Sequence, residues 1–211
     1  MNTTPIKFRQ LLLYLVGCVL FSFGAVLFIA SDLGTNPLDV FTTGVQKQTG
    51  LLIGTTQSLF ALFCLFLWSL IYKFKKFPPV STFLTFFICG YLIDFFLFCF
   101  NRNTAFASSF ELAGALFLCT EASALIIMSN VGIRAMDLIA IALMEKTKIP
   151  FWFYKGAAEV LLFSTGALLG GMFGLGTILF LIFVGWFIQP FILVNEFLGV
   201  PNYGPVKKLK R

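Results

Sequence analysis

Residues 31–40, Ser-Asp-Leu-Gly-Thr-Asn-Pro-Leu-Asp-Val, and residues 129–138, Ser-Asn-Val-Gly-Ile-Arg-Ala-Met-Asp-Leu, are two versions of one motif. The second follows the first by 98 residues (31 to 129), and each lies between two apolar stretches of helical length. The halves match again at a spacing of 95 residues (82 to 177), where Thr82, Gly90 and Asp94 correspond to Thr177, Gly185 and Gln189. A duplicated apolar chain that is interrupted by Gly, Pro and Asp at corresponding places is typical of transporters built from two repeats.

The composition predicts a membrane protein. Of the 211 residues, 59% are hydrophobic and 11% are charged, and the mean hydropathy is +0.95. This balance excludes an ordinary soluble domain and leaves no room for a second, aqueous one, so we expect a single integral membrane domain over residues 1–211. The net charge of +6 lies mostly at chain ends and short links. It therefore indicates topology in a lipid bilayer rather than a surface that binds nucleic acid.

Six apolar runs are long enough to cross a hydrocarbon core of about 30 Å. They cover residues 10–30, 51–72, 79–100, 110–128, 151–172 and 177–198. The first run is too long for the apolar region of a cleaved signal peptide, so we treat it as a retained helix. The sequence thus predicts an all-α membrane protein with six transmembrane helices. Repeat 1 covers about 10–100 and repeat 2 about 110–198, and a basic tail follows at 199–211.

The distribution of Lys and Arg predicts the orientation. Three crossings in each half is an odd number, so the two repeats must be inverted relative to each other. With the N-terminus in the cytoplasm, only Lys47 and Arg102 lie outside, and Lys155 falls within the fifth run. By the positive-inside rule both chain ends are then cytoplasmic. The twelve bases assigned to the inside are Lys7, Arg9, Lys73, Lys75, Lys76, Arg134, Lys146, Lys148, Lys207, Lys208, Lys210 and Arg211.

A short, interrupted segment follows the first run of each half. Gly34 and Pro37 end one helix, and Asn36-Pro37 is suited to begin another. The resulting short helices, near 38–45 and 136–144, cannot span a bilayer. They either lie flat on the two membrane faces or dip in as re-entrant half-helices from opposite sides. In the second arrangement their N-termini point partial positive charge at a shared site suited to an anionic or carboxylate group.

Polar and ionisable side chains at these segments and inside the spans are the candidate site, because such groups are rare in lipid unless they pair or line a path. The substrate-binding candidates are Asn36, Asp39, Gln57, Arg134, Asp137 and Gln189. The candidates for coupling or for buried charge are Asp94, Glu121, Lys155 and Glu159.

Several of these candidates have a second interpretation. Asp39 and Asp137 recur at one place in both halves, which favours a site, although helix capping alone explains either residue. Lys155 and Glu159 lie four residues apart on one helix face and form a structural pair or take part in transport. Glu121 has no sequence-local partner, which leaves a proton-carrying role or an ion pair with Arg134 or Lys155.

Enzymatic and metal sites are not indicated. The chain has no His, and its five Cys residues lie in apolar runs without metal-ligand spacing, so we interpret them as packing residues. Gly166, Gly170 and Gly174 form a ladder of small residues that lets a neighbouring helix approach closely. No nucleophile elbow, phosphate loop or His-based catalytic set is present. We expect no cofactor, no metal and no enzyme.

Two stretches carry a family resemblance. Residues 32–40 with 49–55, and residues 132–137 with 173–189, resemble the signature of the YczE/YyaS/YitT-like bacterial integral membrane proteins. The resemblance spans roughly residues 10–195 and implies a multi-pass protein of the bacterial inner membrane with a transport role. The chain departs from the pattern at 79–82, and again at Ala135-Met136, where the family has Pro-Arg and this chain has its arginine at Arg134. An arginine-based anion contact therefore does not follow from the resemblance.

Together these features predict a gradient-driven permease for a small solute, with its site between the inverted repeats. The alternative is a non-transporting assembly or regulatory subunit of the membrane, in which packing alone explains the charges. The sequence identifies neither the substrate nor the oligomeric state, and a homodimer stays open.

Overall fold

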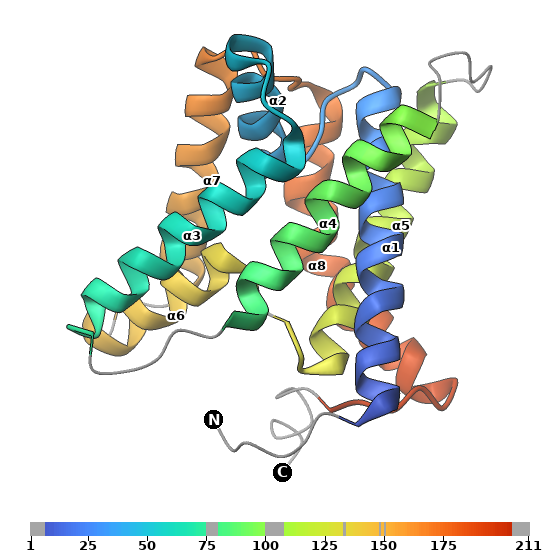
Figure 1. Cartoon of the computed structure of the whole chain (residues 1–211). Coiled ribbons are helices and arrows are strands. Elements are labelled where there is room, and N and C mark those ends of the chain that lie inside the picture. Colours follow the sequence, from blue (N-terminus) through green and yellow to red (C-terminus); the bar gives the residue numbers. More distant parts are fainter. Residues whose placement is uncertain are drawn as a thin grey trace.

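The computed structural model describes residues 7–74, 80–99, 108–132, 134–147, 149 and 151–203 of the chain. These residues form helices joined by short links, with no β-strand among them (Figure 1). The predicted all-α class is confirmed. In chain order the helices are α1 (Phe8–Ala30), α2 (Pro37–Thr49), α3 (Ile53–Ile71), α4 (Val80–Cys99), α5 (Ser108–Ser129), α6 (Ala135–Thr147), α7 (Phe151–Leu168) and α8 (Leu175–Phe197).

Four of these helices, α1, α3, α4 and α5, are long and apolar enough to cross a bilayer. Helix α8 is a fifth if its two arms, Leu175–Val184 and Phe187–Phe197, count as one span across their 53° bend. Pro190 explains the position of the bend, because a proline ring clashes with the carbonyl group four residues earlier, here residue 186. Helix α7, the fifth predicted span, is not among the helices that meet this criterion over the described residues.

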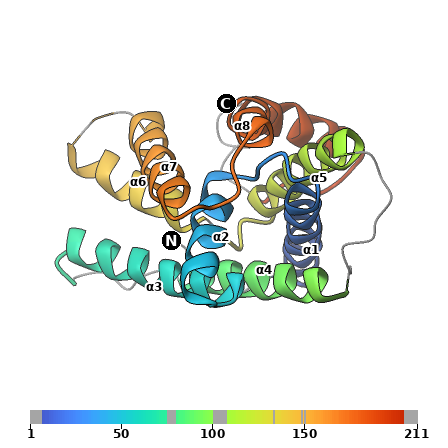
Figure 2. The same cartoon turned by 90° about the horizontal axis from the view of Figure 1, so that it is seen from above.

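Helices α1 and α5 pack extensively against each other on one side of the molecule, with α4 packed against α1 and α8 packed against α5 (Figure 2). Two glycines of α1 allow the close approach. A Cβ at Gly17 would lie 2.8 Å from Cγ1 of Ile126, and a Cβ at Gly24 would lie 2.7 Å from Sγ of Cys119. The first helices of the two sequence repeats therefore pack directly against each other.

The two short helices begin next to each other in the interior. Each has 13 residues, and Leu38 of α2 shares a buried cluster with Ala135 and Met136 of α6. From this point α2 runs to the upper edge of the molecule in Figure 1 and α6 to the lower edge. Lys47 and Lys146, near their C-terminal ends, are exposed. The two interrupted segments thus reach the interior from opposite ends of the molecule.

Helix α2 packs tightly against α7 because glycines leave room for its backbone. A Cβ at Gly166 would lie 2.5 Å from the backbone nitrogen of Phe41, and a Cβ at Gly171 would lie 2.0 Å from the carbonyl oxygen of Val40. Gly166 therefore permits the close helix contact that the predicted small-residue ladder implies.

The other two glycines of that ladder lie outside the helix. Helix α7 ends at Leu168, earlier than residue 172, the predicted end of the fifth span. Gly170 has a φ of +80°, a left-handed conformation that favours glycine and commonly ends helices. Gly170 and Gly174 thus belong to the link between α7 and α8, and the ladder does not continue along one face.

Equivalent helix pairs of the two halves pack differently. Helices α3 and α4 run side by side, and a Cβ on Gly90 would lie 2.6 Å from Cα of Gly54. Helices α7 and α8 make no comparable contact in the part of the chain that the structure describes. The residue of the second half that corresponds to Gly54 is Trp152 (54 to 152, a spacing of 98), so the second sequence repeat has no glycine at this position.

Candidate functional site

The first turn of α2 holds a buried carboxylate. Asn36 precedes the helix, and its Oδ1 accepts a hydrogen bond from the backbone N–H of Asp39 at 3.0 Å. This is the usual capping bond, and Pro37 at the first helical position is pre-organised for it. The Asn36 amide also donates to one carboxylate oxygen of Asp39, and Nε2 of Gln57 from α3 donates to the other at 2.9 Å. Asp39 is completely buried. The side-chain amides of Asn36 and Gln57, both neutral, stabilise its carboxylate by these hydrogen bonds.

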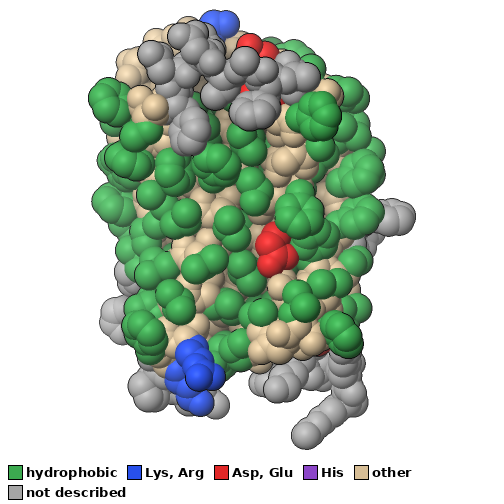
Figure 3. Space-filling view, turned by 90° about the vertical axis from the view of Figure 1, so that its right-hand side faces the viewer, with side chains coloured by type: hydrophobic (Ala, Val, Ile, Leu, Met, Phe, Trp, Pro, Cys, Tyr) green, Lys and Arg blue, Asp and Glu red, His purple; other side chains and the backbone are tan. Residues whose placement is uncertain are grey.

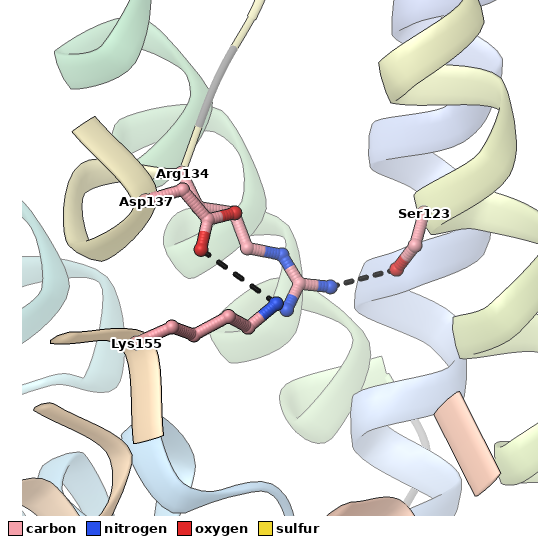
Figure 4. Close-up of polar contacts among 4 residues, drawn as sticks. All are labelled: Ser123, Arg134, Asp137 and Lys155. Atoms are coloured by element: carbon pink, nitrogen blue, oxygen red, sulfur yellow. Dashed lines mark hydrogen bonds and ion pairs between the residues drawn. The ribbon is translucent and has the colours of Figure 1, made fainter. Parts of the chain in front are cut away.

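The first turn of α6 is preceded by an arginine. The carbonyl of Arg134 accepts the first helical hydrogen bond, from Leu138 at 3.0 Å. Its guanidinium donates to Oγ of Ser123 on α5 at 2.7 Å (Figure 4) and lies over the ring of Phe21 on α1, 5.3 Å from its centroid. No carboxylate within the described ranges lies at ion-pair distance from Arg134. Arg134 acts on Asp39 only through a longer-range electrostatic interaction.

Asp137 of α6 pairs with α7. Nζ of Lys155 lies 3.7 Å from Oδ1 of Asp137 (Figure 4), and the two side chains are 28% and 20% exposed. This distance is an ion-pair contact but is too long for a hydrogen bond. Lys155 therefore forms an ion pair with a residue of another helix. The sequence analysis instead favoured a pair with Glu159, which lies on the same helix as Lys155. Glu159 is still close enough to interact electrostatically with Lys155, Arg134 and Asp137.

A cavity of about 40 Å³ lies where the two first turns meet. This is room for about three water-sized probes, since one occupies roughly 10–15 Å³. Arg134 is the one lining side chain with a formal charge among the described residues, and the two amides that bind Asp39 also line the cavity, whereas Asp39 does not. The lining residues are Asn36, Gln57, Thr85 and Arg134, with Phe21, Leu38, Phe86, Cys89, Ile126 and Met136.

The orientation count needs one correction. Arg134 was assigned to a cytoplasmic link, but its side chain lines the interior cavity between the two short helices. Eleven bases (12 − 1) therefore remain on the predicted inside face. The reason is that Arg134 directly precedes the buried first turn of α6, in which Ala135 and Met136 are buried.

Three candidate residues lie away from the cavity. Both carboxylate oxygens of Asp94 accept backbone N–H groups at the start of α3, from Ile53 at 3.1 Å and from Gly54 at 2.6 Å. This is the geometry of a carboxylate at a helix N-terminus. Gln189, the repeat mate of Asp94, is exposed. Asp94 therefore fastens α4 to α3.

Glu121 is the third candidate residue that lies away from the cavity. The amide of Asn195 on α8 donates to both of its carboxylate oxygens, at 2.8 and 3.0 Å. Neither Arg134 nor Lys155 is at ion-pair distance from it within the described chain. Figure 3 shows the face on the right of Figure 1, which is largely apolar with an acidic side chain near its centre. Half-buried Glu121 joins α5 to α8 and stays a candidate for coupling.

Sequence reasoning missed three polar partners: Ser123, Thr85 and Asn195. Ser123 and Thr85 are hydroxyl side chains inside otherwise apolar runs, and this placement was the available signal. Thr85 accepts a hydrogen bond from the buried Tyr14 hydroxyl at 2.8 Å. Asn195 lies in the last turn of the sixth run, where a polar residue at the membrane surface is ordinary, so nothing distinguished it.

A second, larger cavity adjoins the first. It measures about 770 Å³ and lies between α3 on one side and α6 and α7 on the other, with α2 at one end (Figure 2). None of its described lining residues carries a formal charge, and most are Leu, Ile, Phe or Ala. Met136 lines both cavities. The first turn of α6 thus lies between a small cavity that is lined in part by Arg134 and two amides and a large apolar one.

Comparison with known proteins identifies relatives without a known role. The sequence model of a family described as "Family of unknown function (DUF6198)" matches residues 8–192. The chain is also 25% identical, over 188 residues, to the "Uncharacterized protein YyaS" of Bacillus subtilis (strain 168), which covers 87% of this chain and 92% of that protein. No solved structure matches. The resemblance inferred from the repeated motifs is confirmed.

Proposed function

The chain belongs to the DUF6198 family, and we propose that it is a gradient-driven membrane transporter for a small solute. The binding site is the cavity between the first turns of α2 and α6. The observation that carries the proposal is that the residues preceding these two helices, Asn36 and Arg134, line one cavity although they are 98 residues apart (36 to 134). Half-helices whose N-termini meet at a central site are the usual construction of secondary transporters.

The proposal includes the finer topology: six crossings in two inverted three-helix repeats, with α2 and α6 as re-entrant segments. Support comes from the packing of α1 against α5 and from the opposite courses of α2 and α6. Helix α7, with 18 residues, reaches about 27 Å at 1.5 Å per residue, and Asp137 offsets the charge of its Lys155. Both termini then lie in the cytoplasm and the protein resides in the bacterial inner membrane.

The unequal packing of equivalent helices is consistent with a transport cycle. Alternating access requires that two related halves exchange open and closed arrangements around a fixed site. Here α3 is fastened to α4 through Asp94 and the Gly54–Gly90 contact. Helices α7 and α8 lack a comparable contact in the described chain. We therefore assign this arrangement to a state that is closed at the α3–α4 side.

The test is flux through the purified chain in proteoliposomes. Solutes are first selected by thermal shift from a panel of amino acids, thiols, organic anions and organic cations, and the selected solutes are then followed by counterflow. We expect Asp39→Asn and Asp137→Asn to abolish flux without unfolding the protein, because each changes a charge at the first turn of a short helix. Asp32→Asn is the matched control, since Asp32 is exposed and its repeat mate is Asn130. Unchanged flux in both site variants would remove these carboxylates from the transport path.

A further inference from the structure

We propose that the transported solute is a monocarboxylate with an apolar tail. Its carboxylate binds Arg134 in the small cavity, and its tail passes Met136 into the large apolar cavity. This inference rests on the proposed transport function and adds the chemical class of the substrate. It depends on three observations: the charge at the small cavity, the guanidinium donors that remain, and the shared wall between the two cavities.

The small cavity selects a single negative charge. Arg134 is the charged side chain at its wall, and the first turns of α2 and α6 add the partial positive charge of two helix N-termini. The carboxylate of Asp39 is held on the far side of the Asn36 and Gln57 amides and does not reach the cavity wall. Asp137 is paired with Lys155. Arg134 is thus the formal charge at the cavity wall, although the charges of Asp39 and Glu159 also act on it from outside the wall. A ligand that binds at this wall therefore meets a cation, which favours a monoanion.

The guanidinium of Arg134 has N–H donors left for a ligand. One nitrogen donates to Ser123, which fixes the plane of the group, and the Phe21 ring covers one of its faces. An arginine carries five N–H donors in a planar fork that matches the two oxygens of a carboxylate. Because no carboxylate of the described chain occupies this fork, a ligand carboxylate can.

The apolar cavity supplies the place for a tail. The small cavity, at about 40 Å³, holds little more than the carboxylate, whereas the adjoining cavity of about 770 Å³ is within the range of ligand pockets. Met136 is the wall between them and lies two residues after Arg134. Methionine side chains are flexible enough to move aside. A carboxylate at Arg134 is therefore next to the entrance of the apolar cavity.

The experiment measures binding to the full chain in phosphatidylcholine nanodiscs by the shift of its unfolding temperature. The ligands are acetate, butanoate and hexanoate. Nitrate tests an anion without a tail, while 1-hexanol and hexylamine test the same tail without the negative charge. We expect affinity to rise from acetate to hexanoate, up to roughly fourfold for each buried CH₂, given about 0.8 kcal/mol per methylene. Hexanol, hexylamine and nitrate should produce little shift.

Two variants separate the parts of the site. Arg134→Gln should weaken hexanoate about ten- to a hundredfold, as expected for loss of a charged hydrogen-bond partner, whereas Arg9→Gln, at an exposed arginine of α1, should bind like the wild type. Ala158→Phe fills part of the apolar cavity and should retain acetate binding while removing the gain with chain length. In this variant acetate binding also reports that the protein is folded.

The results that would contradict the proposal differ according to which part of it is wrong. Equal binding of acetate and hexanoate, or of nitrate and hexanoate, would overturn the apolar tail. Binding of hexylamine or hexanol in place of the acids, with transport of that ligand in proteoliposomes, would overturn the substrate class and leave the transport function standing. Absence of flux for every solute in the panel would instead contradict the transport function itself.

Discussion

Lys155 pairs with Asp137 at the same repeat positions at which Gln57 binds Asp39. In each half, the third residue of the short helix contacts a side chain one turn into the following long helix. The first half makes this contact with a neutral amide and the second with an ammonium group. The two sequence repeats therefore preserve the contact and change its charge, which makes the halves chemically different around one cavity.

This relationship predicts which substitutions of Lys155 are tolerated. Lys155→Gln should leave the stability close to that of the wild type, because it recreates the first-half contact at Asp137. Lys155→Leu should cost about 1–3 kcal/mol. This is less than the 3–5 kcal/mol typical of breaking a fully buried pair, since these side chains are 28% and 20% exposed. The measurement is unfolding in a denaturing detergent. A double-mutant cycle with Asp137→Asn provides the control: additive effects would mean that the pair does not interact.

The packing of α2 on α7 predicts a sharp difference between two glycines. Gly171→Ala should destabilise the protein by about 1–3 kcal/mol or more, because its Cβ would lie 2.0 Å from the carbonyl oxygen of Val40. Gly156→Ala, on the same side of the molecule, has nothing within 4 Å of its added Cβ and should be neutral or stabilising by about 0.5–1 kcal/mol. Thermal unfolding midpoints distinguish the two. Equal effects would mean that α2 does not lie against α7.

Asp94 is expected to act on stability. Asp94→Ala removes the acceptor of two backbone N–H groups at the start of α3 and should cost about 1–3 kcal/mol. Gln189→Ala, at the exposed repeat mate, should have an effect within about 0.5 kcal/mol. If both variants keep the wild-type unfolding temperature while Asp94→Ala alone stops transport, Asp94 belongs to the coupling machinery instead.

The opposite courses of α2 and α6 predict opposite accessibility. Lys47→Cys should react with a membrane-impermeant maleimide from outside intact cells, and Lys146→Cys only after the membrane is opened, because both residues are exposed at the two ends of the molecule. The background is Cys99→Ser, since Cys99 is the exposed free cysteine in the described chain. Labelling of both positions from one side would contradict the inverted arrangement of the repeats.

Much of the helical organisation could be predicted because it depends on local properties. Apolar runs gave the long helices, and Asn36-Pro37 gave the start of α2 through its capping chemistry. The recurrence of Asp39 and Asp137 indicated a pair of related segments. The end of α7 was predicted too late, because the apolar residues near Gly170 continue past the point where a left-handed backbone ends the helix.

The candidate site was predicted only in part. Of the residues that the sequence grouped as substrate-binding candidates, Asn36, Gln57 and Arg134 line one cavity. It also included Asp94, Glu121 and Gln189, which the fold puts elsewhere. A repeat match reports equivalent positions along the chain, but it does not report whether a side chain turns toward the shared interior or toward a neighbouring helix.

The sequence by itself determined that this is a helical membrane protein, and it predicted two related halves, each with a short helix after its first long one. Hydropathy, helix-ending residues and repetition are properties of neighbouring residues, so they can be read without knowing the fold. Only the tertiary structure decided that Arg134 faces the interior, that Lys155 reaches Asp137, and that α3 closes on α4 while α7 stays apart from α8. These contacts join residues far apart in the chain, and they depend on how closely glycines such as Gly54 and Gly166 let individual helices approach.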